Sequence, residues 1–89
     1  MRAFFTKDFK KAYNKRIAPH NNLVARFESR YDLFIEDRQN PTLKDHQLNG
    51  KLDGHRAFSI TGDIRVVYYI HENVAYFIDI GTHNQVYGR

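Results

Sequence analysis

The chain contains no cysteine among its 89 residues. Disulfide bonds, thiolate zinc sites, iron–sulfur clusters and thiol nucleophiles are therefore all excluded. Any chemistry that the protein performs must use imidazole, carboxylate, hydroxyl, phenol or guanidinium groups. The five histidines form no H-x-H, H-x-x-x-H or H-E-x-x-H pattern. Their spacing gives no support for a metal site, and we expect no metal ion or other cofactor.

Long apolar runs are also missing. No segment approaches the ~18 apolar residues that cross a bilayer, and the N-terminal residues lack the apolar core of a secretory signal. We therefore expect no membrane association and a cytoplasmic location. A chain of 89 residues is too short for two domains, so residues 1–89 are expected to form a single domain. Apolar residues make up 42% of the chain, which is enough for one hydrophobic core.

The common nucleophile and nucleotide motifs are absent as well. The sequence has no G-x-S-x-G elbow, P-loop or G-x-G-x-x-G, so serine nucleophiles and nucleotide hydrolysis are poorly supported. The remaining His, Asp, Arg and Tyr side chains are the types of group that a metal-free ribonuclease needs. Such an enzyme needs a base for a 2′-hydroxyl, a cation at the phosphorus and an acid for the leaving 5′-oxygen. Composition alone favours a plain binding domain, since these residues occur on most protein surfaces.

Positive charge is concentrated near the N-terminus. Residues 1–17 carry six Lys or Arg against one Asp, whereas the other 72 residues carry eight basic and nine acidic side chains. The formal net charge of +4 therefore reflects one basic helix. Such a helix suits a polyanionic partner, although a charge of this size by itself favours the simpler explanation of a solvated helix face.

Hydrophobic periodicity predicts two helices after a short apolar stretch at residues 2–5. The first helix is expected over residues 7–17, with Thr6 as its N-cap. The second is expected over residues 23–38, where apolar residues recur every three or four positions. It should end before Pro41, because the residue preceding a proline is disfavoured in the helical region.

Three β-like runs follow a polar loop, at residues 56–60, 64–70 and 74–80, and short turns separate them. The expected fold class is therefore α+β. It consists of a short N-terminal strand, a helical hairpin and a three-stranded antiparallel meander. Both helices should cover one face of a mostly antiparallel sheet.

Alternation along the strands assigns their side chains to two faces of the sheet. The face that packs against the helices is expected to carry Ile64, Val66, Tyr68, Ile70, Val74, Tyr76, Ile78 and Ile80. The opposite face is then expected to carry Asp63, Arg65, Val67, Tyr69, Ala75, Phe77 and Asp79, with no helix covering it. An open sheet face with an Arg and an Asp on it is a suitable place for a site.

Four short motifs lie in the second half of the chain. They are DHQLNG at 45–50, GHR at 54–56, DIRVVY at 63–68 and GTHNQVY at 81–87. In combination they resemble the D-H-x-L-x-G, G-x-R, D-x-x-x-x-Y and G-T-H-x-x-L/V-[FY] pattern of the RelE/ParE toxin superfamily, and most closely its YafQ-like mRNA interferase branch. The preceding strand and helical hairpin agree with the RelE-like layout by their order.

The resemblance implies a toxin of a type II toxin–antitoxin system that cleaves mRNA, typically at the ribosome and without a metal ion. Its implied partners are a tightly bound cognate antitoxin, mRNA and ribosomal RNA. Matched residue by residue, His46, Asp63 and His83 are the implied catalytic residues. Arg65 lies where related toxins bind a phosphate, and Tyr87 matches the terminal aromatic residue. We expect His83 as the general acid and Asp63 or His46 as the base, since imidazole groups exchange protons near neutral pH.

Two positions depart from the family pattern. Ser59 stands where YafQ-like enzymes carry a second histidine, and we keep it as a substrate-binding candidate. His55 replaces the usual aromatic residue before the arginine of G-x-R. The missing histidine leaves His46, Asp63 and His83 to share the proton transfers.

Each candidate also has a structural interpretation. Asp63 could be a turn residue, Arg65 could pair with Asp79 across the open face, and Tyr87 could simply pack near the C-terminus. For the whole chain, the alternative is a ParE-like toxin directed at gyrase, or an inactive relative, that acts by binding. A plain basic RNA-binding module is a third possibility.

Overall fold

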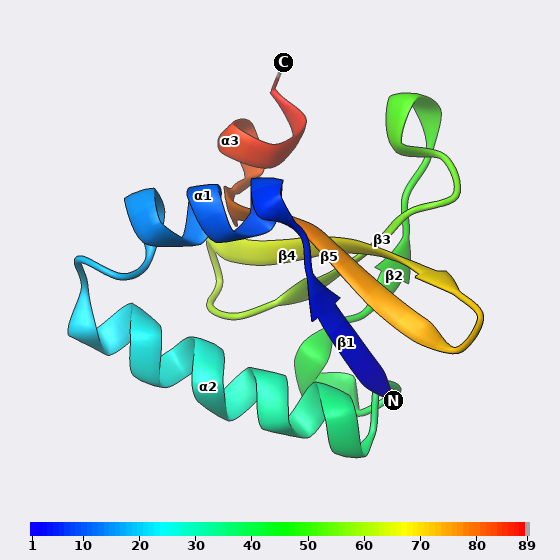
Figure 1. Cartoon of the computed structure of the whole chain (residues 1–89), viewed down its shortest axis with the longest axis horizontal. Helices are drawn as coiled ribbons and strands as arrows, with labels where there is room; N and C mark the ends of the chain where they lie inside the picture. The colour runs from blue at the N-terminus through cyan, green and yellow to red at the C-terminus, as the bar shows by residue number, and fades with distance from the viewer. Residues whose placement is uncertain (89) are drawn as a thin grey trace.

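The computed structural model describes residues 1–88, which form three α-helices, two short 3₁₀ helices and a five-stranded sheet (Figure 1). The elements follow in the order β1 (Arg2–Phe5), α1 (Lys7–Arg16), α2 (Asn21–Glu36), η1 (Pro41–Leu43), β2 (His46–Gln47), η2 (Gly50–Leu52), β3 (Arg56–Ser59), β4 (Ile64–His71), β5 (Val74–Thr82) and α3 (His83–Tyr87). The strand order is β1-β5-β4-β3-β2. Strands β1 and β5 pair in parallel, and the other three pairings of this sheet are antiparallel. The predicted α+β class and mostly antiparallel sheet are confirmed.

The two long helices begin and end close to the predicted positions. Thr6 caps α1 as predicted, since its hydroxyl accepts a hydrogen bond from the Phe9 amide at 3.2 Å. Helix α2 begins and ends two residues earlier than predicted. Its end is not set directly by Pro41. Instead, the Asn40 side chain accepts a hydrogen bond from the Thr42 amide at 3.0 Å and so starts a separate 3₁₀ turn. Within residues 1–88, no helix has the length and apolar character needed to span a membrane.

One hydrophobic core fills the space between the sheet and the two long helices. Helix α1 contributes Phe9, and α2 contributes Phe27 and Phe34, which pack with Phe77 of β5 and Tyr68 of β4. These five aromatic side chains are buried. Burying a large apolar side chain stabilises a fold by about 1.5–3 kcal/mol, so this cluster supplies much of the stability.

The predicted side-chain faces are right for most of β4 and wrong for much of β5. In β5, Ala75 and Phe77 face the helices. On the opposite face, Tyr76 stacks on Tyr69, and Ile78 packs against the second cluster described below. The reason is a β-bulge. Val67 pairs with Asp79 but Tyr68 pairs with Phe77, which leaves Ile78 as an extra residue. A one-residue shift exchanges the two faces. In β4, Ile70 is 38% exposed rather than packed in the core.

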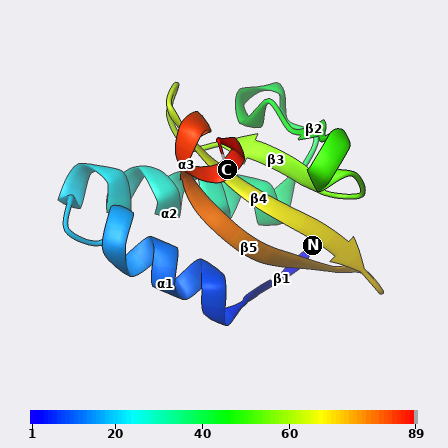
Figure 2. The same cartoon turned by 90° about the horizontal axis from the view of Figure 1, so that it is seen from above.

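A second, smaller apolar cluster lies on the other face of the sheet, which the sequence predicted to be uncovered. It contains Leu48, Ala57, Val67 and Val86. Val86 belongs to α3, which lies above the sheet in Figure 1 while α2 lies below it, and Figure 2 shows the same helix from above. This cluster holds α3 and the loop after β2 against the sheet, so part of that face is covered.

Candidate active site

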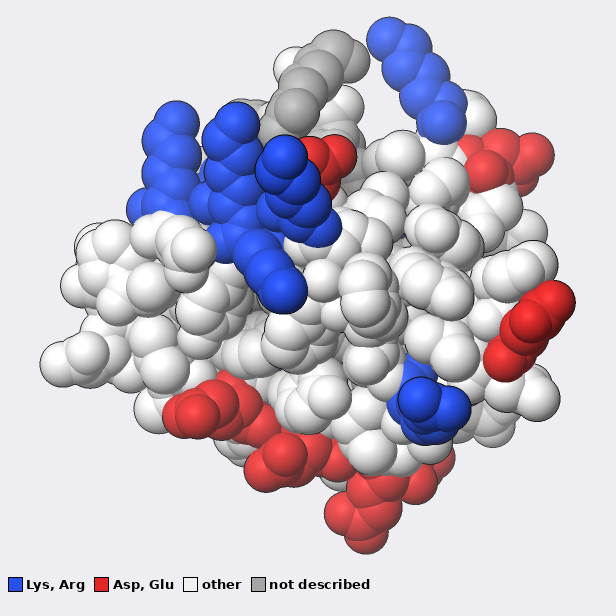
Figure 3. Space-filling view, viewed as in Figure 1, with Lys and Arg blue, Asp and Glu red and all other residues white. Residues whose placement is uncertain are grey.

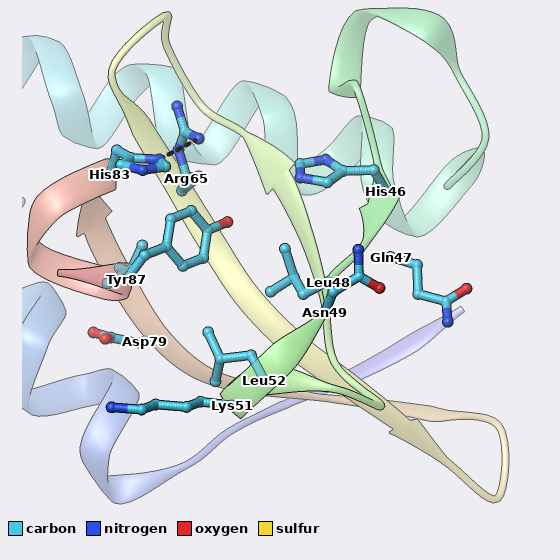
Figure 4. Close-up of a pocket in the computed structure, with 11 residues that line it drawn as sticks. His46, Gln47, Leu48, Asn49, Lys51, Leu52, Arg65, Asp79, His83 and Tyr87 are labelled. Carbon is cyan, nitrogen blue, oxygen red and sulfur yellow. Dashed lines mark hydrogen bonds between the residues drawn. The ribbon is translucent and has the colours of Figure 1, made fainter. Parts of the chain in front are cut away.

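An open cavity of about 730 Å³ lies between α3, the β2 segment with its following loop, and strands β4 and β5. Its lining includes four of the six predicted site residues, which are His46, Arg65, His83 and Tyr87. They come from three elements, β2, β4 and α3, that are far apart in sequence. Figure 4 shows His46 extending from β2 towards the side on which the other three lie.

His83, Arg65 and Tyr87 form a compact group. An Arg65 Nη1 group lies 3.5 Å from Nδ1 of His83, and the Cζ atom of Arg65 lies 5.7 Å from the centre of the Tyr87 ring. The rings of His83 and Tyr87 meet edge to face at 4.7 Å, because residues four apart share one face of a helix. An arginine can only donate, so Nδ1 of His83 is the acceptor in this long contact.

A capping box fixes the start of the short α3 helix that carries two of these residues. The Thr82 hydroxyl accepts from the Gln85 amide at 3.2 Å, and the Gln85 side chain accepts from the Thr82 amide at 2.8 Å. Helix α3 was not predicted. The T-x-x-Q spacing at 82–85 was the available signal, since it is the sequence form of this box.

Two polar atoms at the cavity are buried without a well-formed hydrogen bond among the described residues. They are Nε of Arg65 and the hydroxyl of Tyr87. A buried donor left unpaired costs about 1–3 kcal/mol. Burial raises the pKa of Tyr87, and the neighbouring Arg65 guanidinium only partly offsets this. The Tyr87 hydroxyl therefore keeps its proton at neutral pH, and both groups can donate to an anion.

His46 lies across the cavity with one ring nitrogen already engaged. Its Nδ1 lies 2.9 Å from the carbonyl oxygen of Lys44. A carbonyl can only accept, so Nδ1 carries the proton and Nε2 has a free lone pair when the ring is neutral. That tautomer presents a base to the cavity, because Nε2 is the nitrogen that can take a proton.

A largely buried carboxylate holds the backbone just before His46. Asp45 accepts from Nε of Arg56 at 2.7 Å and from the Tyr68 hydroxyl, and it lies 3.7 Å from Nη1 of Arg38. Its side chain is 6% exposed. Burial and the bond to Asp45 raise the pKa of Tyr68 to about 12, so this phenol stays neutral. Asp45 belongs to the D-H motif, but its anchoring role was not predicted.

The structure does not bring every candidate into the cavity. Asp63 lies exposed at the bend before β4, where its amide donates to the Thr61 hydroxyl, and it is not part of the lining. Ser59 lies opposite Arg65 in the sheet but lines an adjoining groove instead. Asp79 lines the cavity and forms an ion pair with Arg16 of α1 at 3.1 Å. Among the ion pairs of residues 1–88, none joins Asp79 to Arg65.

Among residues 1–88, no group of three or more His, Asp or Glu side chains lies close enough together to hold a metal ion.

Known structures share this fold. A crystal structure of YafQ from E. coli strain BL21(DE3) is 20% identical, with a TM-score of 0.82 and coverage of 99% of this chain and 100% of that chain. The E. coli DinJ–YafQ complex gives 21% identity, a TM-score of 0.80 and the same coverage. A metal-bound toxin from Helicobacter pylori gives 25% identity and a TM-score of 0.75, covering 98% of this chain and 99% of that chain.

The family itself follows from the sequence. No curated protein matches the chain significantly. Residues 1–88 match the model of a family described as the bacterial toxin YafQ of type II toxin–antitoxin systems. That match covers nearly the whole chain and agrees with the predicted RelE/ParE-type, YafQ-like resemblance. This chain therefore belongs to the YafQ family of toxins of type II toxin–antitoxin systems.

Proposed function

We propose that this YafQ-family toxin is a metal-independent endoribonuclease that cleaves mRNA at the ribosome. One observation carries the proposal: two imidazoles, His46 and His83, line the same cavity as Arg65 and Tyr87. Nε of Arg65 and the Tyr87 hydroxyl are buried there without a hydrogen-bond partner among the described residues. These groups match what RNA cleavage by an internal 2′-hydroxyl needs, namely a base, an acid and donors for the phosphate oxygens.

The reaction proceeds by attack of a 2′-oxygen on the adjacent phosphorus. Nε2 of His46 takes the proton from the 2′-hydroxyl as the new P–O2′ bond forms. The P–O5′ bond breaks, and His83 gives its proton to the leaving 5′-oxygen. The products are a 2′,3′-cyclic phosphate and a 5′-hydroxyl. Asp63 stays the alternative base, but it lies outside the cavity lining, so His46 is the better placed of the two.

Arg65 and Tyr87 stabilise the charge that develops on the phosphate. The guanidinium already lies beside both His83 and Tyr87, so one phosphate can contact all three groups. When Arg65 turns to the phosphate, Nδ1 of His83 is released and the ring can carry a second proton. The Tyr87 ring can also stack on an unpaired base, which contributes ~1–3 kcal/mol in single-strand binding.

A cognate antitoxin is the second partner in this proposal. E. coli YafQ has been crystallised in a toxin–antitoxin complex with DinJ. We expect an acidic or mixed-charge segment to cover the cavity of this chain, since its surroundings are basic. Expression without the antitoxin should arrest growth.

The proposed function is tested with translating ribosomes. Purified protein should cut the mRNA, and mapping of new 5′ ends should locate the cuts. His83→Ala should lower the cleavage rate by roughly 10²–10⁴-fold, the range for one lost acid–base group. His20→Ala is the control, because His20 is exposed and makes no side-chain capping bond at the start of α2.

The same variant separates the enzyme from the binding alternative. If growth arrest persists unchanged in His83→Ala and no mRNA is cut, the toxin acts by binding, as a gyrase-directed relative would. Inhibition of DNA gyrase supercoiling by the purified chain would then identify the target.

A further inference from the structure

A second hollow adjoins the candidate active site and has a different character. This groove of about 590 Å³ shares His46 and Arg65 with the cavity. Its lining also includes Arg26, Arg30, Thr42, Lys44 and Ser59. Within residues 1–88, four Lys or Arg side chains and no Asp or Glu line it. We call it the basic groove.

The positive charge of the groove is separated from the acidic surface by the geometry of α2. Arg26 and Arg30 are one turn apart, so they share one face of the helix. Glu28, Asp32 and Glu36 lie on a different face by the same spacing. Figure 3 shows Asp and Glu gathered along the lower edge of the molecule, over α2, while Lys and Arg gather over α1.

Arg26 of the groove is held in place by one hydrogen bond but keeps further donors. Nε of Arg26 donates to the Ile60 carbonyl at 3.3 Å, which fixes the guanidinium against the β3–β4 turn. In the described part of the chain, its terminal nitrogens have no ion-pair partner. Like charges one turn apart destabilise a helix, so the pairing of Arg26 with Arg30 is a cost to the isolated chain.

Lys44 adds an independent observation. Its backbone has φ 51° and ψ 38°, in the left-handed region where a lysine is uncommon and glycine or asparagine is favoured. The backbone conformation of Lys44 therefore destabilises the fold slightly, while its positive side chain lines the groove. Its carbonyl oxygen also accepts the hydrogen bond from His46, so the groove and the candidate base are physically linked.

We propose that the basic groove binds the phosphate backbone of the substrate RNA strand next to the phosphate that is cleaved. This inference rests on the proposed function and extends it by assigning a subsite to the neighbouring nucleotides. Continuity with the cavity through His46 and Arg65 favours the substrate strand over ribosomal RNA as the occupant. The hydroxyls of Thr42 and Ser59 add neutral donors for the same oxygens, which gives Ser59 a binding role rather than a proton-transfer role.

The test uses a short single-stranded RNA made uncleavable by a 2′-deoxy nucleotide at the cleavage position. The double variant Arg30→Gln/Lys44→Gln should bind it about tenfold more weakly than the wild type, since an exposed charge contact contributes up to about fivefold. The magnitude of the slope of log K for RNA binding against log salt concentration should fall by about 1.4, because two phosphate contacts on a single strand are lost. Arg2→Gln/Lys7→Gln is the control, because it removes the same charge outside the groove.

Single phosphates of the RNA are then replaced by neutral methylphosphonates. Replacement at the positions that contact the groove should weaken RNA binding by the wild type several-fold. It should have almost no effect on RNA binding by Arg30→Gln/Lys44→Gln, the groove variant, because the contacts are already lost. Lys44→Gly removes both the charge and the strained backbone, so it should bind RNA more weakly while unfolding at the same or a higher urea concentration. That combination separates lost contacts from lost folding.

Several results would overturn the assignment. Equal RNA affinity of the groove variant and the control variant would do so, as would no measurable RNA binding by the wild type at low salt. Weaker binding of the groove variant to ribosomes without mRNA, with RNA binding unchanged, would assign the groove to ribosomal RNA instead. If the wild type binds the methylphosphonate RNA more weakly than the unmodified RNA but does not cleave mRNA on ribosomes, the groove still binds RNA phosphates. That result would contradict the proposed nuclease activity.

Discussion

Replacing Asp45 by Asn tests whether the carboxylate anchors the backbone that carries His46. The side chain is 6% exposed and accepts two charge-assisted hydrogen bonds, from Arg56 and from Tyr68. Such bonds contribute about 1.5–3 kcal/mol each when buried. Arg56 and Arg38 stay 32% and 24% exposed, so water recovers part of the loss. We expect Asp45→Asn to lower the free energy of unfolding by about 2–3 kcal/mol.

Urea unfolding followed by circular dichroism measures this loss. For a domain of this size an m-value of about 1 kcal/mol/M converts it to a midpoint that falls by about 2–3 M. Asp53→Asn is the matched control, since Asp53 lies exposed in the same polar loop. The cleavage rate of Asp45→Asn should also fall at temperatures where the variant is folded, because His46 loses its fixed position. A stability change within roughly 0.5 kcal/mol of the control, which is the usual size of a surface effect, would refute the anchoring role.

Two further perturbations address other parts of the molecule. The folded-state pKa of Tyr68 is about 12, above the ordinary value of 10.0, so the unfolded chain loses this proton first and stability should fall between pH 10 and 12. The free energy of unfolding should fall by about 3 kcal/mol across that range, and Tyr68→Phe should remove most of this fall in unfolding experiments. An equally steep decline in the variant would show that Tyr68 is not its cause. Neutralising Lys10, Lys11 and Lys15 together should weaken ribosome association and reduce its salt dependence. Unchanged binding across salt would show that the basic surface of α1 is simply solvated.

The sequence predicted those features that depend on local patterns. Thr6 and the apolar spacing located α1, and alternation placed Ile64, Val66 and Tyr68 of β4 correctly in the core. The order of elements then sufficed for the α+β class. These signals depend on neighbouring residues, which is why they can be found without knowing the pairing of the strands.

Features that arise from pairing were missed. The bulge at Ile78 depends on how β4 and β5 align, and nothing in the local alternation of β5 marks it. Strand β2 has only two residues, which is too short for any periodicity. The basic groove was missed for a similar reason, since Arg26 and Lys44 line the same groove only after α2 packs beside the β3–β4 turn.

The candidate site was partly accessible from the sequence. Motif resemblance located His46, Arg65, His83 and Tyr87, which line one cavity in the structure. It also selected Asp63, which lies outside that lining, because a motif records which residues occur together and not how far apart they fold. The Asp45 anchor needed the structure, since its partners Arg56 and Tyr68 lie on two different strands.

Analysis of the RNA ends by mass spectrometry tests the central claim most directly. Wild-type protein, ribosomes and mRNA are incubated, and the 3′ ends of the upstream fragments are identified, with His83→Ala in parallel. The proposed mechanism predicts 2′,3′-cyclic phosphate ends from the wild type and a rate lower by roughly 10²–10⁴-fold in the variant. Fragments that end in a 3′-hydroxyl, or full cleavage by His83→Ala, would contradict it.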